Sequence, residues 1–221
     1  MHITPQKYKK RGGIDKYGFT RYILVKLRKS IENADRLLKG DLMHTAKECI
    51  NKYGSRYRLD QQIEEGKLFH IEQGIYSKDR YVPDLAVICY KYPHGILTLG
   101  TAFYLYGMTD TIPEIYDVAT DRDASKINDV RVHQWFYPTT FFDQGKTTIE
   151  YQGYNLNIYS RERMLIELLR YKTKIPYDLY KEVIQNYRKI MPTLDIQEIQ
   201  CLAMESTKSN RVTERLQEEV F

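Results

Sequence analysis

Residues 46–77 read AKECINKYGSRYRLDQQIEEGKLFHIEQGIYS and carry the clearest local pattern in the chain. Apolar side chains before Gly54, and again between Gly54 and Gly66, fall on one face of a helix, and a glycine commonly ends a helix. Two short apolar pieces, 67–71 and 74–77, follow and are typical of paired strands. This stretch therefore predicts two short helices and a hairpin.

A longer amphipathic segment precedes this stretch. From Tyr22 to Gly40, apolar residues recur three and four positions apart, which predicts a helix that ends at the glycine. Three helices followed by a hairpin, in this order and size, are typical of a winged helix-turn-helix. We predict that such a DNA-binding domain occupies residues 22–78, and that residues 1–21 form a basic N-terminal arm.

The charge of the chain is unevenly distributed. Residues 1–78 hold 17 Lys and Arg against 9 Asp and Glu, whereas residues 79–221 hold 17 against 20. Nine of the bases fall within residues 1–29. A basic segment of this kind indicates either an arm that follows a phosphate backbone or an ordinary solvated tail, and charge alone leaves both interpretations open.

The helix after Gly54 is the predicted recognition helix, and Ser55 is a suitable N-cap for it. Arg suits guanine edges and Gln suits adenine edges, whereas lysines on flanking elements hold the backbone. The candidate DNA-binding residues are Ser55, Arg56, Tyr57, Arg58, Gln61 and Gln62 of this helix, Lys47 and Lys52 of the helix before it, and Lys67 and His70 of the wing. The acids Asp60, Glu64 and Glu65 repel phosphate and favour the alternative, a winged helix that contacts protein.

Residues 79–221 predict a second domain of mixed composition. Val-, Tyr- and Trp-rich pieces at 115–120 and 130–137 predict strands, and residues 147–159 predict a hairpin that turns near Gln152-Gly153. Amphipathic helical patterns flank these pieces on both sides, and a terminal one at 212–220 is expected either to fray or to meet a partner. We therefore predict an α+β protein with a mixed α+β second domain and C-terminal helices.

The sequence gives little support for catalysis. Asp121 and Asp123 follow a predicted strand, where paired carboxylates can hold Mg²⁺ for a nuclease or a nucleotidyltransferase. The Gly-Ser pair that a nucleotidyltransferase needs nearby occurs only at Gly54-Ser55, in the other domain. The three cysteines are far apart and the histidines are scattered. We expect no catalytic residue, no cofactor and no metal site.

Composition also bears on location and partners. The N-terminus lacks the apolar stretch of a signal peptide, and the longest uncharged run, 92–109, contains Pro, His and Gly. We expect a cytoplasmic protein that does not enter a membrane. The 20 tyrosines, many of them interleaved with Lys and Arg in the second domain, fit either core packing or a protein interface.

Three segments carry a family resemblance. Residues 63–77 resemble the wing segment of AbiEi-type antitoxins from type IV toxin–antitoxin (abortive infection) systems. Residues 99–110 are similar to the family's Ser-Ala-Leu-then-Gly-Leu helix, with Thr101 in place of the serine. Residues 159–169 are similar to its Glu-Arg-Thr-Leu-Leu-Asp segment, in which the closing aspartate is either replaced by Glu167 or absent. The segments occur in the family's order, whereas the basic residues 1–20 are not part of its pattern.

This resemblance implies a phage-defence antitoxin that represses its own operon by binding promoter DNA through the winged helix. The second domain would counteract a nucleotidyltransferase-like toxin encoded next door, and a stable complex with that toxin is not required. The resemblance implies no catalytic residue. Two other hypotheses stay open: a winged-helix interaction module without DNA binding, and a Mg²⁺-dependent nuclease or nucleotidyltransferase.

Overall fold

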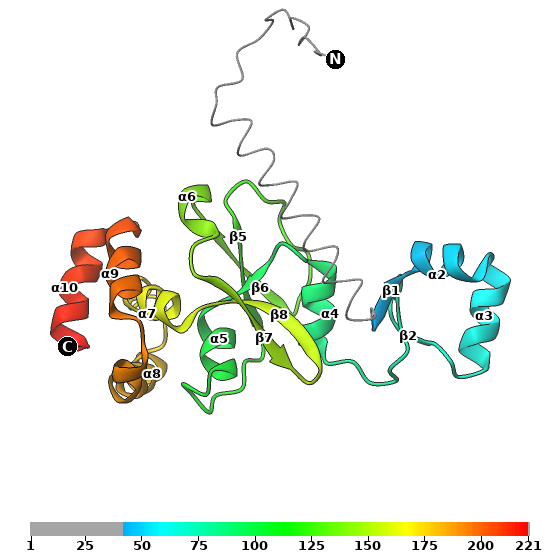
Figure 1. Cartoon of the computed structure of the whole chain (residues 1–221), viewed down its shortest axis with the longest axis horizontal. Coiled ribbons are helices and arrows are strands. Elements are labelled where there is room, and N and C mark those ends of the chain that lie inside the picture. The colour runs from blue at the N-terminus through cyan, green and yellow to red at the C-terminus, as the bar shows by residue number, and fades with distance from the viewer. Residues whose placement is uncertain (1–41, 221) are drawn as a thin grey trace, which may run out of the picture. The chain divides into compact units, whose positions relative to one another are not determined.

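The computed structural model describes residues 42–220, and the chain separates into two compact units between Tyr81 and Val82 (Figure 1). This division falls slightly after the boundary predicted at 78/79. The predicted first helix at 22–40 and the basic arm at 1–21 lie outside the described residues. We refer to residues 42–81 as the N-terminal unit and to residues 82–220 as the C-terminal unit.

The N-terminal unit combines two helices with a small antiparallel sheet. Its elements are β1 (Met43–Thr45), α2 (Ala46–Tyr53), α3 (Arg56–Glu64), β2 (Phe69–Glu72) and β3 (Ile75–Ser77). The strand order is β1-β3-β2, and both pairings are antiparallel. Both helices and the hairpin lie where the sequence predicts them, whereas β1 was not predicted. Its three residues gain strand structure only by pairing with β3, far along the chain.

Local side-chain chemistry fixes where α2 and α3 begin. The Thr45 hydroxyl accepts a hydrogen bond from the Glu48 amide at 3.2 Å, and the Thr45 amide donates to Glu48 Oε2 at 2.7 Å, which makes a capping box. Gly54 ends α2 at φ 87°, a conformation that favours glycine. Ser55 then caps α3 by accepting from the Arg58 amide at 3.3 Å. The turn between the helices is therefore only two residues long.

The core of the N-terminal unit is a small cluster of buried side chains. Cys49, Leu59, Leu68 and Tyr76 are between 0% and 3% exposed, and Ala46, Ile50, Tyr53 and Ile63 pack against them. Each helix and the hairpin contributes to this cluster. The core thus fixes which face of α3 points outward.

The C-terminal unit contains a five-stranded sheet and most of the helices. Its strands are β4 (Ile96–Leu97), β5 (Tyr116–Asp121), β6 (Val132–Tyr137), β7 (Lys146–Tyr151) and β8 (Tyr154–Tyr159). Its helices are α4 (Asp84–Lys91), α5 (Leu99–Leu105), α6 (Thr139–Phe142), α7 (Arg161–Arg170), α8 (Tyr177–Ile190), α9 (Ile196–Glu205) and α10 (Ser209–Glu219), with a 3₁₀ turn η1 (Met191–Thr193) after α8. The strand order is β6-β5-β4-β8-β7, with parallel pairs β4–β8 and β5–β6 and antiparallel pairs β4–β5 and β7–β8.

The predicted β7–β8 hairpin is confirmed. Its turn is made by Gln152 at φ 51° and Gly153 at φ 84°, and two positive φ values in succession are typical of a tight hairpin turn. The strands predicted at 115–120 and 130–137 are β5 and β6 within one or two residues. The α+β class predicted from the sequence is therefore confirmed.

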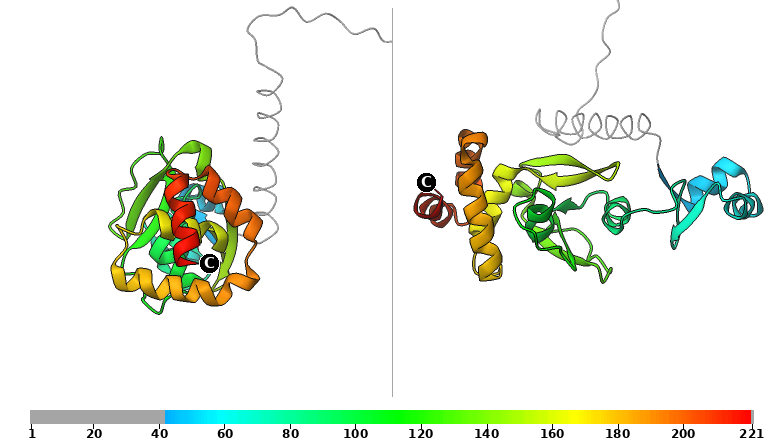
Figure 2. Two further views of the ribbon diagram at one scale, coloured as in Figure 1. Left: turned by 90° about the vertical axis from the view of Figure 1, so that its left-hand side faces the viewer. Right: turned by 90° about the horizontal axis from the view of Figure 1, so that it is seen from below.

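The last four helices form a cluster of their own. Helix α7 contacts α8, α9 and α10, and α10 also packs against α9, as the two views of Figure 2 show. The terminal apolar residues Val212, Leu216 and Val220 are between 2% and 9% exposed. They are therefore buried within this unit, and the terminal helix neither frays over these residues nor leaves them open for a partner. Over residues 42–220, no helix is long and apolar enough to span a membrane.

Candidate nucleic-acid interface

Helix α3 presents one polar face to solvent. Leu59 is fully buried and Ile63 half-buried. Because a helix turns about 100° per residue, the face opposite these two is centred on Gln61 and Tyr57, with Arg58 at one flank and Glu64 at the other. Tyr57, Arg58 and Gln61 are all exposed, Tyr57 to 71%. Gln61 Nε2 donates a hydrogen bond to the Tyr57 hydroxyl at 3.4 Å. The structure thus brings the Tyr57 ring and the Gln61 amide together on one face, with the exposed Arg58 and Glu64 at its flanks.

The two other candidates on α3, Arg56 and Gln62, lie outside this face, about 140° and about 100° around the helix from Gln61. Arg56 is exposed, and its Nε lies 3.4 Å from Asp60 Oδ1, one helical turn on. Gln62 is half-buried, and its backbone carbonyl accepts hydrogen bonds from the amides of Lys67 and Leu68. The structure therefore does not place Gln62 with Tyr57 and Gln61.

The candidates outside α3 are exposed and spread over two elements. Lys47 and Lys52 lie on α2, and Lys52 Nζ is 5.7 Å from the centre of the Tyr53 ring. On the wing, His70 packs against Tyr76 with ring centres 5.2 Å apart. Lys67 pairs with Glu65, Nζ to Oε2 at 2.7 Å, and this hydrogen bond raises the pKa of the lysine.

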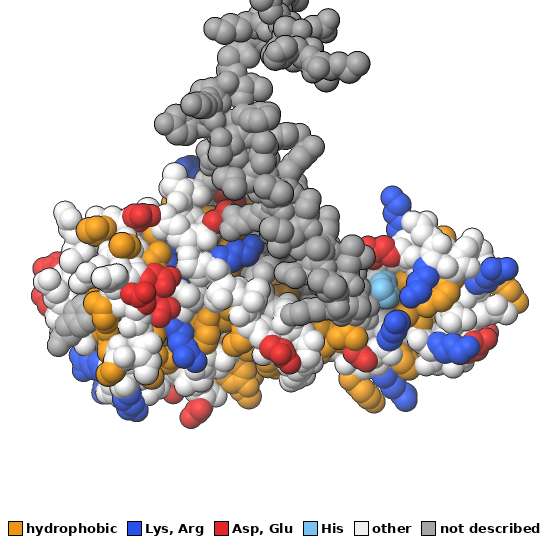
Figure 3. Space-filling view, in the orientation of Figure 1, with side chains coloured by type: hydrophobic (Ala, Val, Ile, Leu, Met, Phe, Trp, Pro, Cys, Tyr) orange, Lys and Arg blue, Asp and Glu red, His pale blue; other side chains and the backbone are white. Residues whose placement is uncertain are grey.

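Two of the three acids of this region are engaged by candidate bases, whereas Glu64 is exposed on α3, one turn after Gln61. Asp60 pairs with Arg56 and Glu65 with Lys67, and all four side chains are about half exposed or more. Figure 3 shows basic side chains spread over the visible face of this unit with acidic ones between them. An exposed ion pair is worth only about 0–1 kcal/mol, so a phosphate can displace the carboxylate from either base.

Asp121 and Asp123, the candidate Mg²⁺ ligands, lie at the end of β5 and in the turn that follows it. Asp121 Oδ1 accepts hydrogen bonds from the Asp123 amide at 2.9 Å and from Thr139 Oγ1 at 3.2 Å. Asp123 is 85% exposed and lies 4.0 Å from Arg122. Among residues 42–220, no group of three His, Cys, Asp or Glu side chains is arranged to hold a metal ion.

A different carboxylate, Asp117 on β5, is the centre of a polar cluster. It accepts hydrogen bonds from Trp135 Nε1 at 2.7 Å and from the Gly100 amide at 3.0 Å, and His133 Nδ1 lies 3.1 Å from its Oδ1. Burial raises the pKa of the Asp117 carboxyl, and the bonds from Trp135 and His133 act against that rise. The cluster ties β5, β6 and α5 together. No Ser, Cys or Thr nucleophile is hydrogen-bonded to the His133 ring in the part of the chain described.

The charged residues of α7 and α10 were not singled out from the sequence. Arg163 and Glu167 are fully buried and joined at 2.8 Å, and Arg170 bonds both Glu167 oxygens at 2.7 Å. Arg211 and Arg215 lie four residues apart on one face of α10, and Lys208 is the N-cap residue three positions before Arg211. This spacing of basic residues is the sequence pattern from which the cationic face of α10 could have been predicted.

Comparisons with known proteins place the chain by fold. No protein-family model and no curated protein sequence matches it. The structure is an α+β protein whose N-terminal unit carries two helices, a tight turn and a hairpin. Among solved structures it is similar to the RV2827C protein from Mycobacterium tuberculosis, with a TM-score of 0.59 and 12% identity over 84% of this chain and 76% of that one. At this identity the likeness shows the fold alone.

Proposed function

We propose that the protein is a DNA-binding transcription regulator whose helix α3 reads the major groove. The observation that carries this proposal is the exposed face of α3, where Tyr57 and Gln61 are hydrogen-bonded opposite the buried Leu59 and Arg58 is exposed at the flank. Arg and Gln are side chains that bond base edges in pairs of hydrogen bonds. Lys52 on α2 and Lys67 on the wing lie on the elements that hold the backbone in helix-turn-helix proteins.

The first test is fluorescence anisotropy of the full chain on its own upstream DNA and on a duplex of the same composition in scrambled order. We expect tighter binding to the upstream DNA, and affinity that falls at least about tenfold between about 50 and 200 mM salt, because phosphate contacts release counterions. Equal and weak binding to both duplexes would favour the alternative, a winged helix that contacts protein.

We further propose that this regulator is an antitoxin of the type IV class. The support is the ordered resemblance of residues 63–77, 99–110 and 159–169 to AbiEi-type antitoxins. In this proposal the N-terminal unit represses the operon, and the C-terminal unit counteracts a nucleotidyltransferase-like toxin from the neighbouring gene. The proposal assigns no catalytic residue, cofactor or metal to this chain, and it does not require a stable complex with the toxin.

The separate roles proposed for the two units can be tested in cells. Co-expression of the full chain with the neighbouring gene product is expected to restore growth, and Arg58→Ala with Gln61→Ala is expected to restore it equally, because both side chains belong to the DNA-reading face of the other unit. Growth curves and the protein level of each variant are measured together. Growth arrest with a well-expressed double variant would contradict separate roles for the two units, and arrest with the unaltered chain would overturn the antitoxin proposal.

A further inference from the structure

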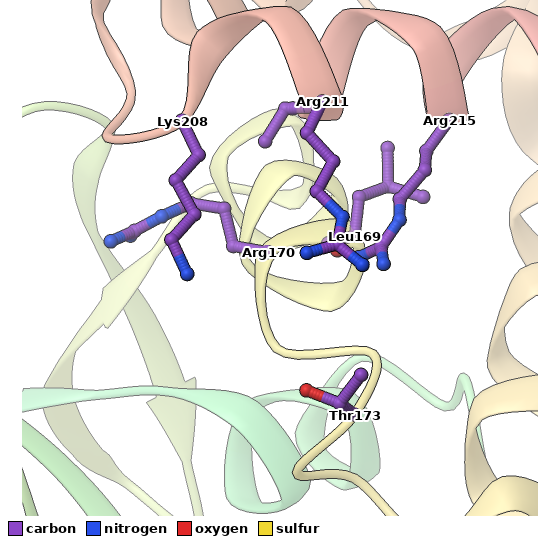
Figure 4. Close-up of a pocket in the computed structure, with 7 residues that line it drawn as sticks. Leu169, Arg170, Thr173, Lys208, Arg211 and Arg215 are labelled. Atoms are coloured by element: carbon purple, nitrogen blue, oxygen red, sulfur yellow. The ribbon is translucent and has the colours of Figure 1, made fainter.

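The end of α7 and one face of α10 enclose a small hollow lined by four cationic side chains (Figure 4). The cations are Arg170, Lys208, Arg211 and Arg215, and Thr173 adds a hydroxyl at the opposite side. The hollow has a volume of about 30 Å³. A single water needs about 10–15 Å³ measured in this way, so the hollow admits one small polar group rather than a whole nucleotide.

The cations of α10 are concentrated on a single face. Arg211 and Arg215 of α10, and Lys208 at its N-cap, extend toward the end of α7 (Figure 4). Arg211 and Arg215 lie one turn apart within α10, and like charges at this spacing repel, so an anion between them would relieve the repulsion. Neither Lys208 nor Arg211 forms an ion pair with any acid among residues 42–220.

The buried carboxylate of Glu167 is already paired with arginines of α7. Glu167 accepts hydrogen bonds from both Arg163 and Arg170, and Arg170 Nη2 donates to Thr207 Oγ1 at 2.6 Å. Arg215 Nη1 donates to the Leu169 carbonyl at 2.5 Å, which satisfies the negative end of α7. Fold stability therefore accounts for Arg170 and Arg215. It leaves the charges of Lys208 and Arg211 unexplained.

We propose that this hollow binds the terminal phosphate of a small phosphorylated ligand. A phosphate monoester carries close to two negative charges at neutral pH and offers three acceptor oxygens, and guanidinium groups recognise such oxygens in pairs. A phosphodiester in a nucleic acid backbone carries one charge and continues on both sides, which suits an open groove rather than a hollow for one group. The monoester is therefore the better match in charge and in size.

The test follows backbone amide resonances of the full-length protein by NMR during titration with inorganic phosphate, adenosine 5′-monophosphate and adenosine. We expect saturable shifts of residues 169–173 and 208–215 with phosphate and with the monophosphate, and none with adenosine. A scrambled DNA duplex is the fourth probe. If the duplex shifts these resonances at lower concentration than the monophosphate does, the ligand is a nucleic acid backbone and the proposal is overturned.

Variants of Lys208 and Arg211 test whether these two cations bind the phosphate. Lys208 has φ 67°, which asparagine tolerates, so the variant Lys208→Asn with Arg211→Gln removes two charges without opposing the backbone. We expect phosphate to bind at least about tenfold more weakly, since charge-assisted hydrogen bonds are the strong ones. Arg211→Gln alone, at an exposed helical position, gives the same direction if the double variant unfolds.

The matched control removes the same charge elsewhere. Lys126→Gln with Lys181→Gln also lowers the net charge by two, and both lysines are exposed and outside the hollow. We expect this control to bind phosphate as the unaltered chain does. Equal weakening in both double variants, or no saturable shift at 169–173 and 208–215 in the unaltered protein, would overturn the site.

Discussion

Glu167→Gln is expected to lower the free energy of unfolding by about 3–5 kcal/mol, because it leaves two arginines without their shared counter-ion inside the protein. The side chains of Glu167 and Arg163 are 0% exposed, and that of Arg170 is 9% exposed. Glutamine keeps the shape of the side chain, so the change isolates the charge. The loss is an upper-range value for one substitution, since most cost about 1 kcal/mol.

The surroundings of Arg163 explain why the carboxylate is needed. Its guanidinium lies 3.4 Å from the centre of the Phe141 ring and 4.7 Å from that of Tyr159, and Nη1 donates to the Phe141 carbonyl at 2.8 Å. Nη2 is buried without a hydrogen-bond partner, so Glu167 carries most of the compensation. Burial alone would lower the pKa of Arg170, yet the Glu167 carboxylate raises it overall.

The measurement is urea unfolding followed by circular dichroism, with the slope against denaturant compared between variants. The control is Glu218→Gln, an exposed carboxylate on α10, which we expect to change the free energy of unfolding by less than about 0.5 kcal/mol. A cost below about 1 kcal/mol for Glu167→Gln would show that water or a neighbouring acid replaces the carboxylate, and the buried ion cluster would not be a main support of this unit.

Locally determined features were predictable from the sequence. The Gln152-Gly153 turn and the Ser55 cap follow from the chemistry of one or two residues, and both are found. Strand β4 was not predicted, because two residues, Ile96 and Leu97, become a strand only by pairing with β5 and β8 from distant parts of the chain. The presence of β4 in the middle of the sheet therefore cannot be predicted from local sequence and is seen only in the tertiary structure.

For charged residues too, local features can be predicted from the sequence, whereas burial that depends on distant parts of the chain cannot. Arg163 occurs in Arg161-Glu162-Arg163, which in a sequence suggests an exposed helix start. Its burial depends on Phe141 and Tyr159, which come from other elements. On α3, helical periodicity correctly predicts that Tyr57 and Gln61 are exposed opposite Leu59 and Ile63. It does not predict that the Gln62 carbonyl accepts hydrogen bonds from the Lys67 and Leu68 amides, since that depends on where the chain turns after Gly66.

The largest effect on function is expected from Arg58→Ala with Gln61→Ala on α3. Each base contact of this kind is worth about 1–3 kcal/mol of discrimination, so the double variant is expected to bind the upstream DNA about a hundredfold more weakly. Binding to the scrambled duplex is expected to change only a few-fold, because phosphate contacts supply most of the non-specific affinity. Arg56→Ala is expected to cost less, because Arg56 lies outside this face and pairs with Asp60.

Anisotropy on the two duplexes separates base reading from backbone contact. Loss of preference at an unchanged salt slope means that Arg58 and Gln61 bond bases, whereas uniform weakening with a slope reduced by about one means that Arg58 bonds a phosphate. The control, Arg122→Ala with Gln185→Ala, removes the same exposed residue types from the C-terminal unit. A double α3 variant that kept full affinity and preference would place DNA reading elsewhere than on α3, since substitutions at exposed positions leave the cap at Ser55 and the core around Leu59 in place.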